Sequence, residues 1–239
     1  MANKININQE QFYTNEILQE SNIINEEFVH IKVRGGRCYA FFKRLFDIVV
    51  SFVATIIISP LLIILWLLVK LTSKGPGIYT SIRVGKNGKK FKFYKFRSMV
   101  VNAEEMKKDL MNQNEMKDGV YFKMKDDPRI TKIGKFLRKT SLDELPQLFN
   151  ILKGDISIVG CRPCLVEEYE KMSEYQKQRF LVPAGLTGEW QVRARSTSSS
   201  FEEVVKYDLD YIQNKRGFWY DIKLIFLTFG VVLSGKGAE

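Results

Sequence analysis

The chain has 239 residues, of which 45% are hydrophobic and 27% charged, with only six prolines. These proportions exclude a disordered tail and a fibrous repeat, and they fit one domain of ordinary size with an appendage. The 37 lysines and arginines exceed the 27 acidic residues, and the net charge of +10 favours a polyanionic partner: nucleic acid, an anionic membrane surface or a phosphorylated substrate. Three cysteines are too few for a disulfide framework and suit a reducing compartment.

The N-terminal region differs in composition from the rest of the chain. Residues 1–31 hold one lysine and five glutamates, a net charge of −4, so the other 208 residues carry +14. Apolar residues are too sparse here to bury a core, and we predict an acidic, Asn/Glu-rich extension over residues 1–40 followed by one domain over 41–239. Without a basic n-region or an early apolar run, no secretory signal peptide is expected.

A membrane segment follows. Residues 48–69 contain no charged side chain, and 22 residues would form a helix about 33 Å long, enough to cross a hydrocarbon core. Ser59 and Pro60 lie at its middle, where proline removes a backbone hydrogen bond, so a break or kink is expected. Basic residues flank the segment on both sides, which favours a re-entrant helix over 48–71 that enters and leaves on the cytoplasmic face. A kinked spanning helix is the alternative, and the residues leave both open.

The remaining elements indicate an α+β fold. Asn87-Gly88 lies between β-rich runs at 78–84 and 90–99, which predicts a hairpin with a type I′ turn. Apolar spacing predicts amphipathic helices, and the apolar C-terminal stretch either lies in the membrane interface or packs on the core. The expected helical segments are 103–118, a helix that begins near Ser141, and 202–214, and the apolar C-terminal stretch is 218–233.

Two adjacent acids form the most informative short motif. Ser141 and Glu144 match the S-x-x-E capping box, and acids in the first turn of a helix favour its dipole, so helix capping is one explanation. The other explanation is chemical. Asp143 and Glu144 follow Arg138 and Lys139, so they could supply a carboxylate nucleophile and a metal ligand beside phosphate-binding cations.

Two further motifs carry weaker signals. The basic, aromatic strand 91–97 could stack bases, but it does not match an RNA-recognition motif and lies close to a membrane segment, so we expect no nucleic-acid partner. Cys161 and Cys164 form a C-x-x-C, yet the chain offers only Cys38 and His30 as further Cys or His ligands, which argues against a zinc site.

Three long runs together resemble the bacterial sugar transferase family, the monotopic polyprenyl-phosphate phosphoglycosyl transferases. The resemblance extends from about Phe41 to the C-terminus in the order of the family's motifs. The runs are GPGIYTSIRVGKNGKKFKFYKFRSM, DPRITKIGKFLRKTSLDELPQLFNILKGDISIVG followed by CRP, and PAGLTGEWQVRARS followed by DLDYI.

The resemblance implies an enzyme on the cytoplasmic face of a bacterial plasma membrane. Such an enzyme transfers a sugar 1-phosphate from a UDP-sugar to polyprenyl (undecaprenyl) phosphate and releases UMP, as the first step of exopolysaccharide or other glycoconjugate assembly. The family's chemistry makes Asp143 the nucleophile that carries a covalent phosphosugar, and Glu144 the ligand of Mg²⁺. The re-entrant helix would be broken at Ser59 and Pro60, and the lipid bilayer would be a partner.

The same motifs imply further substrate contacts and some departures. Expected phosphate or nucleotide contacts are Lys95, Arg97, Arg138, Asp155, Arg162 and Arg195. Cys161 stands where the family usually has proline, which implies a less rigid backbone around Arg162. Neither the identity of the sugar nor the oligomeric state follows from the sequence, and a homo-oligomer is compatible with it. The rival hypothesis is a catalytically inactive basic membrane adaptor of a polysaccharide pathway.

Overall fold

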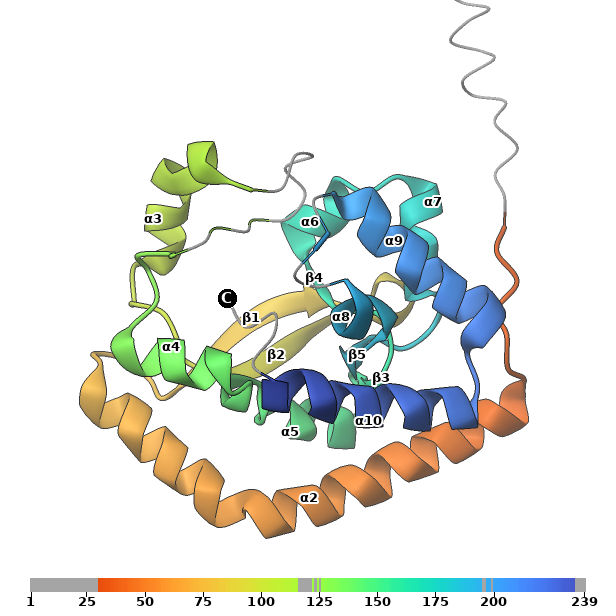
Figure 1. Ribbon diagram of the computed structural model, residues 1–239, viewed down its shortest axis with the longest axis horizontal. Helices are drawn as coiled ribbons and strands as arrows, with labels where there is room; N and C mark the ends of the chain where they lie inside the picture. The colour runs from red at the N-terminus through yellow and green to blue at the C-terminus, as the bar shows by residue number, and fades with distance from the viewer. Residues whose placement is uncertain are drawn as a thin grey trace, which may run out of the picture. The chain divides into compact units, whose positions relative to one another are not determined.

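The computed structural model describes residues 30–115, 122, 124, 126–194, 197–198 and 200–234. The chain divides into two units, Met1–His30 and Ile31–Glu239, and the fold belongs to the second. Two small sheets are surrounded by helices (Figure 1), which confirms the mixed helix and strand class. The second unit begins before the expected boundary at residue 41, because Ile31 is buried in the main core and the amide of Arg34 donates to the carbonyl of Ile212.

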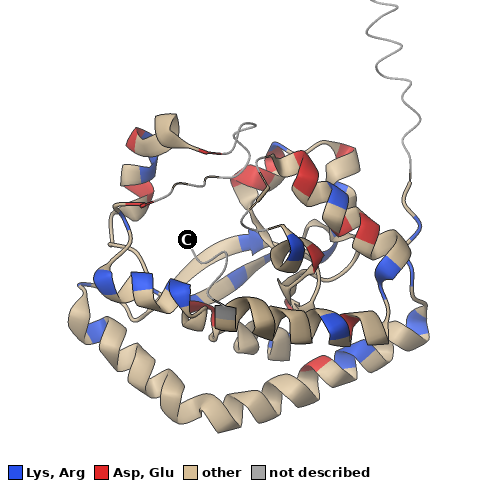
Figure 2. Ribbon diagram, viewed as in Figure 1, with Lys and Arg blue, Asp and Glu red and all other residues tan. Residues whose placement is uncertain are grey.

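Helix α2 (Arg37–Thr72) contains the predicted membrane segment and begins eleven residues before Ile48. Among the described helices it is the one long and apolar enough to cross a membrane, judged by length and composition. Its middle exposes large apolar side chains such as Phe52 and Ile57. The charged residues of α2 lie toward its ends, and its middle contains none (Figure 2).

Pro60 bends α2 and does not interrupt it. The helix continues through Pro60 to Thr72, and its axis is visibly bent (Figure 1). Proline cannot donate to the carbonyl four residues earlier, which is that of Ile56. The hydroxyl of Ser59 donates to this carbonyl at 2.9 Å and satisfies the acceptor that Pro60 leaves without its usual partner. The expected kink is therefore present, but the helix is not interrupted, and Ser59 donates to the carbonyl that Pro60 leaves without a backbone donor.

The predicted hairpin is confirmed. Strands β1 (Ile78–Val84) and β2 (Lys90–Phe96) pair antiparallel, and β4 (Cys164–Leu165) adds to the free edge of β1. Asn87 and Gly88 both have positive φ, as a type I′ turn requires. The second strand ends three residues before the expected residue 99. A separate parallel pair joins β3 (Ser157–Val159) to β5 (Gly185–Thr187).

The helices around the sheets are mostly short. The expected helix 103–118 ends at Leu110 and continues as a 3₁₀ turn over Met111–Gln113, while residues 116–118 lie outside the described part. The segment 202–214 is helical as predicted, with a final π-helical turn over Tyr211–Lys215. The α-helices after α2 are α3 (Ala103–Leu110), α4 (Lys132–Lys139), α5 (Gln147–Lys153), α6 (Val166–Glu170), α7 (Glu174–Lys177), α8 (Glu189–Arg193), α9 (Phe201–Asp210) and α10 (Phe218–Ser234).

Two apolar clusters hold these elements together. The larger one gathers side chains from α5, β3, α9 and α10, and the smaller one packs Leu65 and Val69 of α2 against Phe96 and Leu137. Helix α10 packs on the core, which is one of the two alternatives expected for the C-terminal stretch. Its Leu224 is fully buried in the larger cluster, while other faces leave aromatic rings such as Trp219 exposed.

Candidate active site

The two adjacent acids lie in a tight turn between α4 and α5. Ser141 has a φ of 55° in the left-handed region, and its side chain makes no capping hydrogen bond. Residues Leu142–Glu144 form a 3₁₀ turn, and α5 begins only at Gln147. The predicted capping box is therefore wrong, and so is the helix start near Ser141, because the left-handed residue redirects the chain before the helix begins.

The turn brings Asp143 and Glu144 to a cationic segment that is distant in sequence. Asp143 is 7% exposed. The Oε1 atom of Glu144 lies 3.5 Å from Nη1 of Arg162, which follows the buried strand β3. The predicted metal ligand Glu144 is therefore a neighbour of the predicted cation of the CRP motif.

Helix α4 holds Arg138 beside the same turn. The Nε atom of Arg138 donates to Oγ of Ser98 at 3.0 Å, and the side chain of Thr131 caps the start of the helix by accepting from the amide of Gly134. A Cβ atom at Gly134 would lie 1.9 Å from the carbonyl oxygen of Ser98, so only glycine permits this close packing.

Lys95 of strand β2 lies within electrostatic reach of this cluster. Desolvation and the positive charges of Arg138 and Arg83 lower the pKa of Lys95 to about 8, although the Asp143 carboxylate acts in the opposite direction. Lys95, Arg138 and Asp143 therefore form one electrostatic unit. We define Asp143, Glu144, Lys95, Arg138 and Arg162 as the acid–cation cluster.

The structure does not bring Arg97 into the acid–cation cluster. Its guanidinium is buried, and Nη2 donates to the carbonyl and the hydroxyl oxygen of Ser73, both at 2.7 Å, at the end of α2. Nη2 thus has a structural role, whereas Nε and Nη1 are buried without a hydrogen-bond partner among the described residues, and the phosphate contact stays a prediction. A cation placed at a helix C-terminus satisfies carbonyls that have no partner within the helix.

Asp155 and Arg195, the other two predicted contacts, have different outcomes. The Oδ2 atom of Asp155 accepts from Nδ2 of Asn150 at 2.9 Å, and Asn150 also bonds the backbone of strand β2 at Lys92 and Tyr94. Asp155 thus supports Asn150, the residue that connects α5 to strand β2 of the hairpin. Arg195 lies outside the described residues.

Two functional candidates on β1 were missed by the sequence reasoning. The ammonium of Lys95 lies 5.1 Å from the ring centroid of Tyr79, and the charge of Arg83 acts on Lys95. Tyr79 is paired with Lys95 in the register, and Arg83 lies four residues along the same strand face. Side chains alternate between the two faces of a strand, and the hairpin turn fixes the register of β1 against β2. These two features could have predicted that Tyr79 and Arg83 lie on the same face as Lys95.

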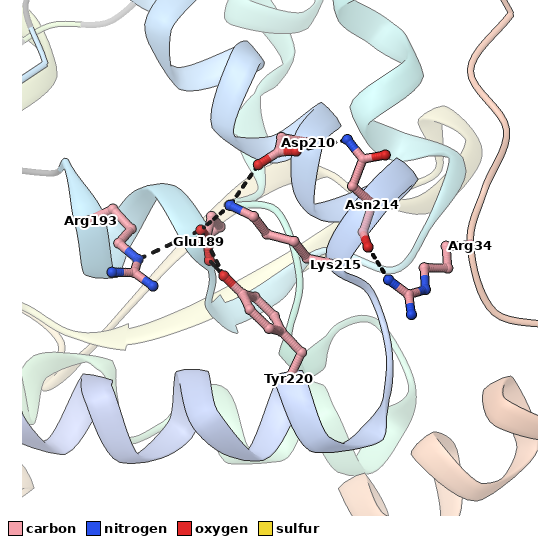
Figure 3. A network of polar contacts seen from close by, with 7 residues as sticks. All are labelled: Arg34, Glu189, Arg193, Asp210, Asn214, Lys215 and Tyr220. Carbon is pink, nitrogen blue, oxygen red and sulfur yellow. Dashed lines mark hydrogen bonds and ion pairs between the residues drawn. The ribbon is translucent and has the colours of Figure 1, made fainter.

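A second polar network surrounds the buried Glu189 at the start of α8. Its carboxylate accepts from Nζ of Lys215 at 2.8 Å and from the hydroxyl of Tyr220, and Arg193 approaches to 3.6 Å (Figure 3). Lys215 also pairs with Asp210. This network connects α8 to the π-helical turn and to α10.

Comparison with known proteins identifies the class. The family model described as bacterial sugar transferase matches residues 38–235, and the chain belongs to this family.

Curated relatives agree with that class. The chain is 56% identical over 165 residues to "Galactosyl transferase CpsE" of Streptococcus agalactiae, which covers 69% of this chain and 36% of the relative. It is 43% identical over 224 residues to "Undecaprenyl-phosphate galactose phosphotransferase" of Salmonella typhimurium, covering 91% of this chain and 46% of the relative. Both relatives are more than twice as long as the matched region. "Exopolysaccharide production protein ExoY" of Sinorhizobium fredii, 37% identical over 199 residues, is covered to 87% of its length and 82% of this chain.

Proposed function

We propose that this protein transfers a sugar 1-phosphate from a UDP-sugar to undecaprenyl phosphate and thereby initiates the assembly of an exopolysaccharide or another glycoconjugate. The acid–cation cluster carries the proposal, because it places two carboxylates beside three cations in a member of the bacterial sugar transferase family. Relatives named as undecaprenyl-phosphate galactose and glucose phosphotransferases support the choice of donor and acceptor.

The reaction proceeds in two displacements at one phosphorus atom. A carboxylate oxygen of Asp143 forms a bond to the phosphorus that bears the sugar, and the bond from this phosphorus to the bridging diphosphate oxygen breaks. UMP leaves with that oxygen. An oxygen of undecaprenyl phosphate then attacks the same phosphorus, the acyl phosphate bond breaks, and the Asp143 carboxylate is restored.

The cations of the cluster supply charge stabilisation. Phosphoryl transfer depends mainly on positioning and on neutralising charge at the phosphate oxygens. Lys95, Arg138 and Arg162 converge on the carboxylate turn from three different elements, so they can hold a diphosphate between them. The ionised carboxylate of Asp143 is the nucleophile in this scheme.

The residues of the site fit a Mg²⁺ ion shared with the substrate. Among the described residues no group of three or more potential ligands is present, so a cage built from protein alone is not formed. Mg²⁺ is commonly held by one or two carboxylates together with substrate phosphates. Glu144 would hold it, since its carboxylate contacts Arg162 only at 3.5 Å. The ion would neutralise phosphate charge.

Attachment of both ends of α2 to one folded unit supports a re-entrant topology. Before the bend, Nζ of Lys43 lies 2.6 Å from Oδ2 of Asp221, and the amide of Ile158 donates to Asp47. After the bend, Leu65 and Val69 pack in the smaller cluster. Because one folded unit lies on one side of a bilayer, both ends of α2 lie on the same face, which we assign to the cytoplasm. The exposed apolar middle enters the lipid.

UMP release is the first test of the activity. Protein in nanodiscs would receive undecaprenyl phosphate, Mg²⁺ and one UDP-sugar at a time. We expect UMP from at least one sugar, no UMP with EDTA, and no UMP from an Asp143→Asn variant. Asp109→Asn, an exposed acid on α3, is the matched control and should turn over normally. Full turnover by Asp143→Asn would refute the nucleophile. Lipid binding without UMP release from any donor would favour the inactive adaptor.

Topology is tested separately with cysteines placed on each side of α2. In a Cys38→Ser background, Lys32→Cys and Lys74→Cys introduce thiols at two exposed positions. A membrane-impermeant maleimide should leave both positions unlabelled in intact spheroplasts and label both after permeabilisation. Labelling of one position but not the other in intact cells would show a spanning helix and overturn the re-entrant assignment.

A further inference from the structure

A cavity of about 250 Å³ lies between α3 and α6, outside the acid–cation cluster. One wall is formed by α3 with Glu104, and the other by α6 with Glu167 and Glu168. Phe122 and Met111 contribute apolar surface. Its volume is slightly below the roughly 300 Å³ at which small-molecule pockets begin, so it suits one part of a ligand better than a whole nucleotide sugar.

Two side-chain contacts connect this cavity to Lys95. On one side, Lys95 lies over the ring of Tyr79, and the hydroxyl of Tyr79 donates to Oε1 of Glu104 at 3.2 Å. On the other side, Arg83, whose charge acts on Lys95, has Nη1 4.0 Å from Oε2 of Glu168. Tyr79 therefore connects Glu104 in one wall to Lys95, and Arg83 connects Glu168 in the other wall to Lys95.

The lining chemistry selects an uncharged, hydroxyl-bearing group. Three glutamates and three lysines (Lys107, Lys108 and Lys171) line the cavity, so the lining carries no net formal charge, and its side chains both accept hydrogen bonds from hydroxyl groups and donate to them. The acid–cation cluster, with three cations and two carboxylates, binds phosphate better. Within the described part of the chain, Glu167 makes no hydrogen bond or ion pair, so its carboxylate is available to a ligand. The ring of Phe122 offers an apolar surface for the C–H face of a sugar ring.

We propose that this cavity receives the hexosyl group of the nucleotide-sugar donor and that Glu104 and Glu167 bind its hydroxyl groups. The inference rests on the proposed function, and it extends that function by locating the part of the protein that contacts the sugar. The uridine diphosphate portion then lies toward Lys95, Arg138 and Arg162, where the positive charge is concentrated.

Binding measured without turnover tests the cavity independently of the reaction. Calorimetry in nanodiscs would compare UDP with the UDP-hexose that the protein binds best, on the wild type and on a Glu104→Gln/Glu167→Gln double variant. The matched control is Glu105→Gln/Glu170→Gln, which changes the next glutamate on α3 and another on α6, both exposed and outside the cavity lining. The cavity variant should bind the UDP-hexose about tenfold more weakly, as expected for lost hydrogen bonds to charged acceptors, and UDP as before.

Three results would overturn the inference. If the cavity variant weakens UDP and UDP-hexose equally, the cavity holds the uridine portion. If it weakens neither, the cavity does not contact the donor. If the control variant loses the same affinity, the effect is one of surface charge. Failure of the proposed function would be seen in a different measurement. The wild type would then release no UMP, whereas the binding of UDP and UDP-hexose could still be compared between variants.

Discussion

Nζ of Lys43 lies 2.6 Å from Oδ2 of Asp221, and both side chains are buried. The hydroxyls of Tyr39 and Tyr211 donate to the same carboxylate, at 2.6 and 2.7 Å. This group joins the first half of α2 to α10 and to the π-helical turn before it. The membrane helix is thus fixed to the fold by a buried charge pair as well as by apolar contacts.

Removing Lys43 should destabilise the protein strongly. Lys43→Met keeps the aliphatic stem but leaves Asp221 buried without its cation, and breaking a buried pair in this way costs roughly 3–5 kcal/mol. Thermal unfolding in nanodiscs would measure the loss. Lys223→Met, at an exposed position on α10, is the control and should change stability little. Equal effects of the two substitutions would show that the buried pair contributes nothing.

Substitution of Arg97 distinguishes a structural role from a phosphate contact. In Arg97→Met the end of α2 loses the hydrogen bonds to Ser73, so we expect the melting temperature to fall by about 5 °C, from the typical value of hydrogen bonds to charged groups. The affinity for UMP should stay within about twofold of the wild type. Lys92→Met, exposed on the same strand, is the control. Weaker UMP binding with unchanged melting would restore the phosphate contact predicted from the motif.

The pH dependence of the reaction should report Lys95. Because its pKa is lowered to about 8, the ammonium is charged below that pH and is lost as the pH rises through it. The value of kcat/KM for the UDP-sugar should therefore fall above about pH 8, since this parameter reflects groups of the free enzyme. Lys95→Arg, which stays charged, should remove the decline, whereas Lys92→Arg should not. A decline that persists in Lys95→Arg would assign it to another group.

The three cysteines should differ sharply in reactivity. Burial raises the pKa of Cys164 to about 12 and that of Cys161 well above its usual range, whereas Cys38 is exposed. The thiolate is the reactive form, so one thiol should react quickly with a disulfide reagent in the native protein and three after denaturation. Loss of the fast phase in Cys38→Ser would confirm the assignment. Fast reaction of two or more native thiols would contradict the burial of the C-x-x-C.

Sequence alone determined the features that depend on local order. The charge-free run of 22 residues predicts a membrane helix wherever the chain folds, because no tertiary contact changes its hydrophobicity. Asn87-Gly88 determined the hairpin, since both residues tolerate the positive φ of a type I′ turn. The family motifs likewise pointed to Asp143 and Glu144, and Glu144 lies 3.5 Å from Arg162 in the structure.

Tertiary structure decided what local patterns leave ambiguous. Ser141 and Glu144 match a capping box, but the left-handed backbone at Ser141 sends the chain into a 3₁₀ turn before α5 begins. Lys95 and Arg97 are two residues apart in one motif, yet only Lys95 faces the carboxylate turn, because Arg97 follows the strand and bonds to the end of α2. A motif records which residues occur together, whereas the directions of their side chains depend on strand ends and on packing partners that are distant in the sequence.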